Sequence, residues 1–531
     1  MSDIFSKWRR MTHFDPELSE LRRTAAAMAA VLATYGSALL LEHLAGLHVD
    51  IVILAIVLSM IAGRIQRAGD PVDRIAGLVV LPAAALAASG ISRLMSMHPD
   101  AGDALFVAAM FASIWVRRFG RRAARAGMLI VAPLIAVLIM PSSALPGPGT
   151  LWVVVIALIA WCWVTVFQLL ATATGFAPPS RGVPAAGPRA GAAARRRVLA
   201  STRMALQLGV ALAAAFAIGR TIWPGHWTWT VLTAFIVCSG TRSRGDVVLK
   251  GVLRGAGAAA GTVVATAIAG TFGPHADASV AVMFAALAIA TWLREFSYVW
   301  WAACVTAVLS LLYGWFGQSV GGLLDTRLEG IALGAALGIA VSWLILPIRT
   351  SDVARRRTAD ALVALGDVLS ADWHDPAALR RDQVAFQRAV AGLAQIAPAL
   401  RAHRLLLSRL HASKPGTPEL ADAVDAIEHS ARSVGTLVSA ATADHTAVAD
   451  PCVQQLNQAV AANIIAARRA IGRRPGADYQ AATAAACRGV IGKPDRRGEF
   501  LGALADIDRD LATICATFSP VGKERSRPAS P

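Results

Sequence analysis

The residues of this sequence that suggest chemistry most strongly are basic side chains inside an apolar stretch. Lys250, Arg254, Gly257 and Gly261 recur every three or four residues, so they share one face of a helix. A guanidinium in an apolar helix is costly unless it faces protein or water, and glycines permit close approach of another helix. Lys250 and Arg254 could therefore line an anion pathway. Alternatively, both side chains extend to the membrane interface and the glycines simply pack.

A second stretch repeats this arrangement. Arg327, Gly330 and Gly334 follow nearly the same spacing, with Asp325 and Glu329 beside the arginine. An arginine between two carboxylates at a membrane entry suggests a gate or a proton-coupling cluster. A structural ion pair explains the same residues equally well.

Aromatic residues surround a histidine in the segment that begins at Arg220. His226, Trp227 and Trp229 could stack an aromatic substrate and titrate near neutral pH. Interfacial tryptophans also anchor membrane proteins in general, so an anchoring role is the alternative interpretation.

Motifs for other chemistry do not stand out. The sequence contains no GxxxxGK[ST] motif for nucleotide phosphates and no HExxH pattern. Its six cysteines form no CxxC pair, which disfavours zinc or redox sites. We therefore expect no catalytic residues, no metal and no cofactor, and we do not expect an enzyme.

The elements that must position these residues are apolar. Of the 531 residues, 56% are hydrophobic and 16% are charged, whereas soluble domains carry about 25% charged residues. A membrane helix needs about 20 mostly apolar residues. Twelve candidate runs occupy residues 24–44, 47–63, 75–95, 103–116, 126–141, 150–172, 202–219, 227–240, 247–272, 277–293, 296–314 and 326–347. The sequence predicts an all-α polytopic membrane protein with about twelve transmembrane helices.

The net charge of +17 is explained by orientation rather than by nucleic acid. Up to Arg294, nearly all basic loop residues fall on one side of the twelve-span arrangement, and the other side holds only Arg93, Arg220 and Arg327. Basic loops face the cytoplasm, so both termini are predicted to be cytoplasmic. We expect the lipid bilayer as a partner and no nucleic acid.

The two halves of the apolar region resemble each other. The segment from Asp103 matches the segment from Asp277, and Gly63 corresponds to Gly240. Two parallel six-helix repeats are typical of transporters. The predicted domains are an N-terminal cytoplasmic segment (1–23), a first repeat (24–174), a flexible linker (175–201), a second repeat (202–347), a C-terminal cytoplasmic helical domain of about five helices (348–518) and a disordered tail (519–531).

The motifs together resemble a known family. The segment Trp-Pro-Gly-His-Trp-Thr-Trp, the pattern Arg254-x-x-Gly257-x-x-x-Gly261 and the pattern Arg327-x-x-Gly330-x-x-x-Gly334 are similar to those of the fusaric acid resistance (FUSC) / aromatic acid exporter family. The resemblance is clearest over residues 200–350. It implies efflux of aromatic carboxylic acids or related weak organic acids across the bacterial inner membrane. Arg254 and Arg327 would then attract the substrate carboxylate.

We expect a small organic anion as substrate and proton coupling as the driving force. A periplasmic adaptor protein and a second copy of the chain, forming a homo-oligomer, are further candidate partners. A passive organic-anion channel stays open, because plant malate channels are distant relatives of the family. So does a non-transporting scaffold or sensor that acts through its C-terminal domain. A major facilitator protein is less favoured, since its basic loop motif would follow the second span and Arg118–Arg122 follow the fourth.

Overall fold

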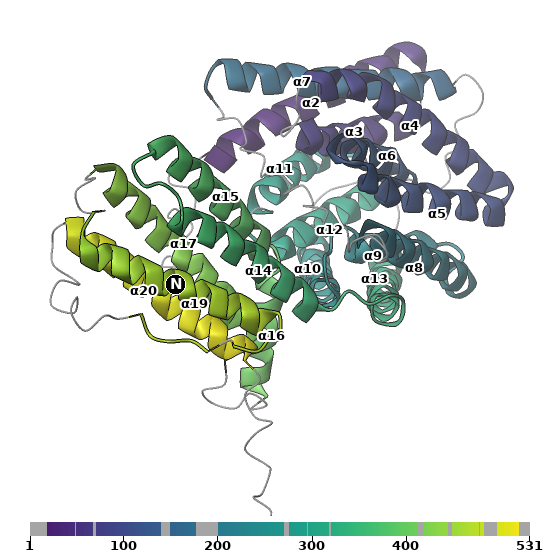
Figure 1. Ribbon diagram of the computed structural model, residues 1–531. Coiled ribbons are helices and arrows are strands. Elements are labelled where there is room, and N and C mark those ends of the chain that lie inside the picture. Colours follow the sequence, from purple (N-terminus) through teal and green to yellow (C-terminus); the bar gives the residue numbers. More distant parts are fainter. Residues whose placement is uncertain are drawn as a thin grey trace, which may run out of the picture. The chain divides into compact units, whose positions relative to one another are not determined.

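Helices account for all the regular structure that the computed structural model describes (Figure 1). The described residues are 19–47, 49–66, 71–139, 149–176, 200–269, 275–294, 296–317, 320–410, 418–443, 449–476, 478–482 and 496–519. The predicted all-α class is thereby confirmed. Most of the predicted N-terminal segment, most of the linker (175–201) and the tail beyond residue 519 lie outside the described residues.

Each of the twelve predicted runs overlaps a helix. The first half contains α2 (Ser19–Ala45), α3 (Asp50–Gln66), α4 (Pro71–Met97), α5 (Pro99–Trp115) followed by the short η1 (Val116–Phe119), α6 (Arg121–Ile139) and α7 (Gly149–Ala173). The second half contains α8 (Ala200–Ile222), α9 (Trp227–Cys238), α10 (Arg244–Ala269), α11 (Asp277–Leu293), α12 (Tyr298–Trp315) and α13 (Val320–Leu344). Within the described residues, nine helices are long and apolar enough to cross a membrane. The chain is therefore a polytopic membrane protein.

Three of the predicted spans are not among these nine helices. Helices α3 and α11, with 17 residues each, are at the lower limit of length for crossing a bilayer, and α9, with 12 residues, is below it. The exact twelve-span layout thus remains a prediction.

The first-half helices pack around α7, which contacts α2, α3 and α4. Gly77 of α4 lies directly against Trp161 of α7, whose indole N–H donates to the Arg74 carbonyl at 3.1 Å. Gln66 and Thr165 hydrogen-bond to each other across the α3–α7 contact at 2.9 Å. Internal pairing of this kind is what polar groups require within a hydrocarbon environment.

In the second half, α9 packs between α8 and α13. The glycines of α13 make this close approach possible. A Cβ added to Gly330 would lie 3.1 Å from the Trp229 Cβ, and one added to Gly334 would lie 2.9 Å from the Thr233 Cβ. The glycine-bearing face of α13 is therefore a helix-packing surface.

Several helix contacts join the halves. Helix α5 packs against α8, α11 contacts α2, α6 contacts α9, and η1 contacts α8. At the first contact, Asp103 accepts two hydrogen bonds from Arg220, at 2.5 Å from Nε and 2.7 Å from Nη2. The same guanidinium lies over the Trp227 ring, 4.2 Å from its centroid. The α5–α8 contact is thus held by a bidentate ion pair.

The remaining helices belong to a second compact unit, which is formed mainly by the described residues from Ile348 onward. It contains α14 (Thr350–Leu369), α15 (Pro376–Ala394), α16 (Ala397–Arg409), α17 (Leu420–Ala443), α19 (Pro451–Ile471) and α20 (Arg496–Phe518). Phe386 and Phe500 are fully buried in its core. Asp508 accepts hydrogen bonds from Asn463, Tyr479 and the Ala482 N–H at 2.7, 2.7 and 2.9 Å, which ties α19 and α20 to the segment between them.

Candidate functional site

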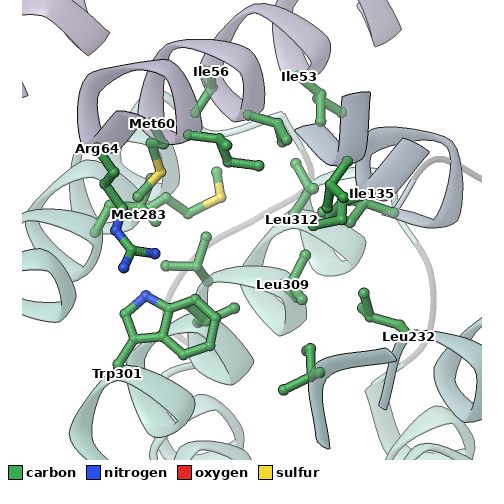
Figure 2. A pocket seen from close by; sticks show the side chains of 18 of the residues that line it. Ile53, Ile56, Met60, Arg64, Ile135, Leu232, Met283, Trp301, Leu309 and Leu312 are labelled. Carbon is green, nitrogen blue, oxygen red and sulfur yellow. The ribbon is translucent and has the colours of Figure 1, made fainter. Parts of the chain in front are cut away.

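The first compact unit, formed mainly by the described residues up to Pro347 and called the membrane unit below, contains a cavity of about 890 Å³. Its wall comes from helices of both halves, α2, α3, α5, α6, α9, α10, α11 and α12, together with η1. Figure 2 shows aliphatic side chains over most of its surface, with the Arg64 guanidinium pointing towards the Trp301 indole. A cavity of this size lies near the upper end of the range for small-molecule sites.

Acidic and basic residues of the cavity wall lie at opposite ends of α11. Six cations line the cavity: Arg64, Arg117, Arg125, Lys250, Arg254 and Arg294. Two carboxylates, Glu42 and Asp277, line it as well. Asp277 begins α11 and Arg294 follows its last residue, so a helix about 25 Å long separates them. The cavity therefore extends along α11 between an acidic end and a basic end.

Arg254 is the most deeply buried of these cations. Its side chain has no exposed surface. Nη1 donates to Thr306 Oγ1 at 3.3 Å, while Nε and Nη2 have no hydrogen-bond partner in the part of the chain that the structure describes. No carboxylate of the described side chains forms a salt bridge with it. A buried guanidinium is expensive unless it is paired, so an anion in the cavity would stabilise Arg254.

Two glycines place Arg254 at this depth. A Cβ on Gly257 would lie 2.7 Å from the Ala302 Cβ, and one on Gly261 would lie 2.9 Å from the Thr306 Cβ. Helices α10 and α12 therefore touch along the glycine-bearing face. Arg254 lies on the same face of α10, and the close contact between the helices brings its guanidinium within hydrogen-bond distance of the Thr306 hydroxyl.

Lys250 lies one turn before Arg254 on α10 and also lines the cavity. Its ammonium donates to the Ser239 carbonyl at 2.6 Å and lies 5.6 Å from the centroid of the Tyr298 ring. Lys250 therefore contributes positive charge to the cavity, and its hydrogen bond to Ser239, which follows α9, fixes the position of its ammonium group.

Arg327 lies behind the cavity wall and is 3% exposed. It donates from Nη1 to Ser310 Oγ at 2.6 Å and from Nη2 to the Thr306 carbonyl at 3.0 Å, and it lies over the Trp229 ring at 4.2 Å. Thr306 thus contacts both predicted arginines, through its hydroxyl and its carbonyl. The structure brings Arg254 and Arg327 together on one residue of α12.

The carboxylates predicted beside Arg327 do not join this cluster. Glu329 is exposed, and residues two apart on a helix point to nearly opposite sides. The side chain of Asp325 lies outside the described part of the chain. The partners that the structure gives Arg327 are instead two α12 oxygens and a tryptophan ring.

The predicted aromatic cluster is also divided. Trp227 stacks with Arg220 and Phe216, whereas Trp229 faces Arg327 and Tyr313. His226 precedes α9 and is partly exposed. None of these three side chains lines the cavity. Residues 227 and 229 face different neighbours because they are two positions apart on one helix.

Sequence analysis did not single out Thr306, which contacts both arginines, or several residues that line the cavity. Thr306 and Trp301 resemble ordinary residues of an apolar run, and Arg64, Arg117, Arg125 and Arg294 resemble loop cations at helix ends. Their convergence depends on tertiary packing. The available signal was their shared position at the basic ends of neighbouring helices. No group of three or more His, Cys, Asp or Glu side chains in the described ranges could hold a metal ion.

Part of the chain, including both buried arginines, matches a known protein family. No curated protein matches the chain significantly. The family described as "Fusaric acid resistance protein-like" matches residues 208–341, which include α9 to α12 and most of α13. That stretch contains Arg254, Arg327 and Thr306. The resemblance predicted from the motifs is thus confirmed, and the half of the membrane unit that carries both buried arginines is similar to the fusaric acid resistance family.

Proposed function

We propose that this protein is an efflux transporter for weak organic acids in their anionic form, the class that includes aromatic carboxylic acids. The observation that carries the proposal is Arg254, a fully buried guanidinium in a cavity wall whose Nε and Nη2 find no hydrogen-bond acceptor among the described residues. An entering carboxylate would satisfy both groups. It would also gain from the charge of Lys250 nearby.

The distribution of charge supports a direction of transport. With both termini placed in the cytoplasm, Arg64, Lys250 and Arg294 lie at the cytoplasmic end and Asp277 at the periplasmic end. An anion would be attracted at the basic end and released at the acidic end. Export from the cytoplasm of a bacterial inner membrane follows from this polarity.

The helix contacts support two parallel six-helix repeats. Helix α5 packs on α8 as the fourth helix of one half against the first of the other, and α11 contacts α2 in the same relation. Transporters with such repeats bind substrate between the halves, where this cavity lies. The proposed transport needs no covalent chemistry from the chain. A periplasmic adaptor and self-association are proposed as partners that complete the export path.

Transport by cells or vesicles tests this proposal. Cells with the wild-type protein should accumulate less radiolabelled hydroxybenzoic or fusaric acid than cells without it, and an uncoupler should abolish the difference if protons drive export. The Arg254→Gln variant should accumulate the acid like cells without the protein at equal expression. A reduction that persists with the uncoupler would support a passive channel. Equal accumulation for a broad acid panel, with and without the protein, would refute transport and leave the scaffold interpretation.

A further inference from the structure

The cavity wall between its charged ends is aliphatic. Figure 2 places Ile53, Ile56 and Met60 of α3 opposite Met283 of α11 and Leu309 and Leu312 of α12. These side chains are branched or flexible rather than flat, so they match a flexible hydrocarbon chain better than a planar ring. The basic end and this aliphatic wall belong to one continuous cavity.

Four of the six aromatic side chains of the wall contact one another in pairs. Tyr35 packs against Phe284 with ring centroids 4.8 Å apart, and Trp301 packs against Tyr298 at 5.6 Å. The guanidinium of Arg294 covers the Trp301 ring at 4.7 Å. The tryptophans that sequence analysis assigned to an aromatic substrate, Trp227 and Trp229, lie outside the cavity. Among the described residues, Phe235 and Trp315 are therefore the aromatic side chains of the wall that pair with no other wall ring, so aromatic stacking sites are a minor part of a mostly aliphatic surface.

Cavity size gives the same indication. A volume of 890 Å³ lies in the range of pockets that enclose whole drug-sized ligands, roughly 300–1,000 Å³. A single-ring carboxylate held at Arg254 would leave most of the aliphatic wall in contact with water. A ligand with a longer apolar body would cover that wall.

We infer that the cavity binds a long-chain aliphatic carboxylate, with its head group at Arg254 and its chain along Met283, Leu309 and Ile56. This inference rests on the proposed function and narrows its substrate class. Each buried methylene should strengthen binding about four-fold, until the chain fills the cavity.

The experiment is a chain-length series with the full-length protein in phosphatidylcholine nanodiscs. Calorimetric titration compares hexanoate, octanoate, decanoate and dodecanoate, with empty nanodiscs as the reference for membrane partitioning. Protein-dependent affinity should rise about four-fold per methylene. Decyltrimethylammonium, which has the same chain and the opposite charge, should show no protein-dependent binding. Affinity that is flat along the series, or equal in empty discs, would overturn the inference.

Variants separate the two parts of the site. Leu309→Trp and Ile56→Trp, from opposite walls, should each flatten the chain-length dependence, whereas Arg254→Gln should weaken every member by about 10- to 150-fold and keep the slope. If affinity still rises with chain length in both tryptophan variants, and both proteins have a normal elution profile, the alkyl chain of the ligand binds elsewhere and the inference is overturned.

Nanodiscs that contain phosphatidylglycerol distinguish the sources of such an anion. Unchanged decanoate affinity would support a free carboxylate as the ligand, and loss of affinity there would assign the cavity to acidic lipid and overturn the free-acid assignment. Uncoupler-sensitive export of hydroxybenzoic acid, combined with a flat alkyl series, would refute the aliphatic chain and leave the proposed function intact. Absence of both would refute the two together.

Discussion

Replacement of Arg254 by glutamine should weaken anion binding without lowering the stability of the protein. Among the described residues, this guanidinium has one hydrogen bond, a long one of 3.3 Å to Thr306, while Nε and Nη2 are unpaired. Its desolvation costs several kcal/mol, and little in the wall repays that cost. Removing the charge should relieve the cost, although a glutamine amide in the same space needs partners of its own, worth about 1–3 kcal/mol.

The two effects of Arg254→Gln therefore have opposite signs. Stability should stay unchanged or rise by about 1 kcal/mol. The loss of a charge-assisted contact to a carboxylate costs about 1.5–3 kcal/mol, or about 10- to 150-fold in affinity. Lysine at the same position should recover part of the affinity, because it keeps the charge without the planar fork.

Arg327 provides the matched control. It makes two short hydrogen bonds and a cation–π contact with Trp229, so Arg327→Gln should lower stability by about 3 kcal/mol. Its effect on anion affinity should be smaller, since it lies behind the wall. Differential scanning fluorimetry measures stability, and titration with hydroxybenzoate or decanoate measures affinity. If Arg254→Gln lowers the melting temperature as much as Arg327→Gln and leaves anion binding unchanged, Arg254 is a structural residue and the reasoning fails.

Three further predictions concern packing, charge and thiol reactivity. Gly261→Leu should destabilise the protein because its side chain would collide with Thr306 across the α10–α12 contact. Gly255 faces open space on the same helix, so Gly255→Leu should fold normally. Equal melting temperatures for the two variants would contradict this packing. Asp103→Asn should lower stability by about 2 kcal/mol, because it leaves the partly buried Arg220 without its ion pair. Asp277→Asn should keep stability within about 0.5 kcal/mol of the wild type and change the rate of acid export. The reverse pattern would refute the roles assigned to the two carboxylates. Burial raises the pKa of the Cys515 thiol to about 11, with Asp508 adding to the shift, so a variant that retains only Cys515 should react with maleimide negligibly at pH 8 and progressively faster as the pH approaches 11. Rapid labelling at pH 8 without denaturant would show that the thiol is accessible in the native state.

Sequence patterns predicted the helices better than they predicted the site. The apolar runs are long and their lengths are limited by the bilayer, so all twelve overlap helices in the structure. Arg254 could be found because it interrupts such a run and shares a face with glycines. That signal is local, and it survives without knowledge of tertiary contacts.

The other cavity cations carry no such local signal. Arg64, Arg117 and Arg294 lie at helix ends, where a lysine or arginine ordinarily orients a membrane protein. Only packing of α3, α5 and α11 around one space gives them a second role. The predicted stacking of a substrate on Trp227 and Trp229 also depended on packing that the sequence does not show. The two residues are close in sequence, but on the helix they face Arg220 and Arg327, respectively.

The proposed duplication also offers a physical reason why the cavity has an acidic end. Asp103 and Asp277 begin matching segments, and under the repeat they would hold equivalent contacts, α5 with α8 and α11 with α2. At the first contact Arg220 neutralises Asp103. The offset that relates Gly63 to Gly240 puts His43, which is exposed, at the position equivalent to Arg220. This position therefore supplies no permanent cation to Asp277, which lines the cavity together with Glu42. If the halves are repeats, one of two equivalent contacts forms a closed ion pair, and the other leaves its carboxylate at the acidic end of the cavity. A difference at a single cationic position would then distinguish a structural interface from the proposed transport path.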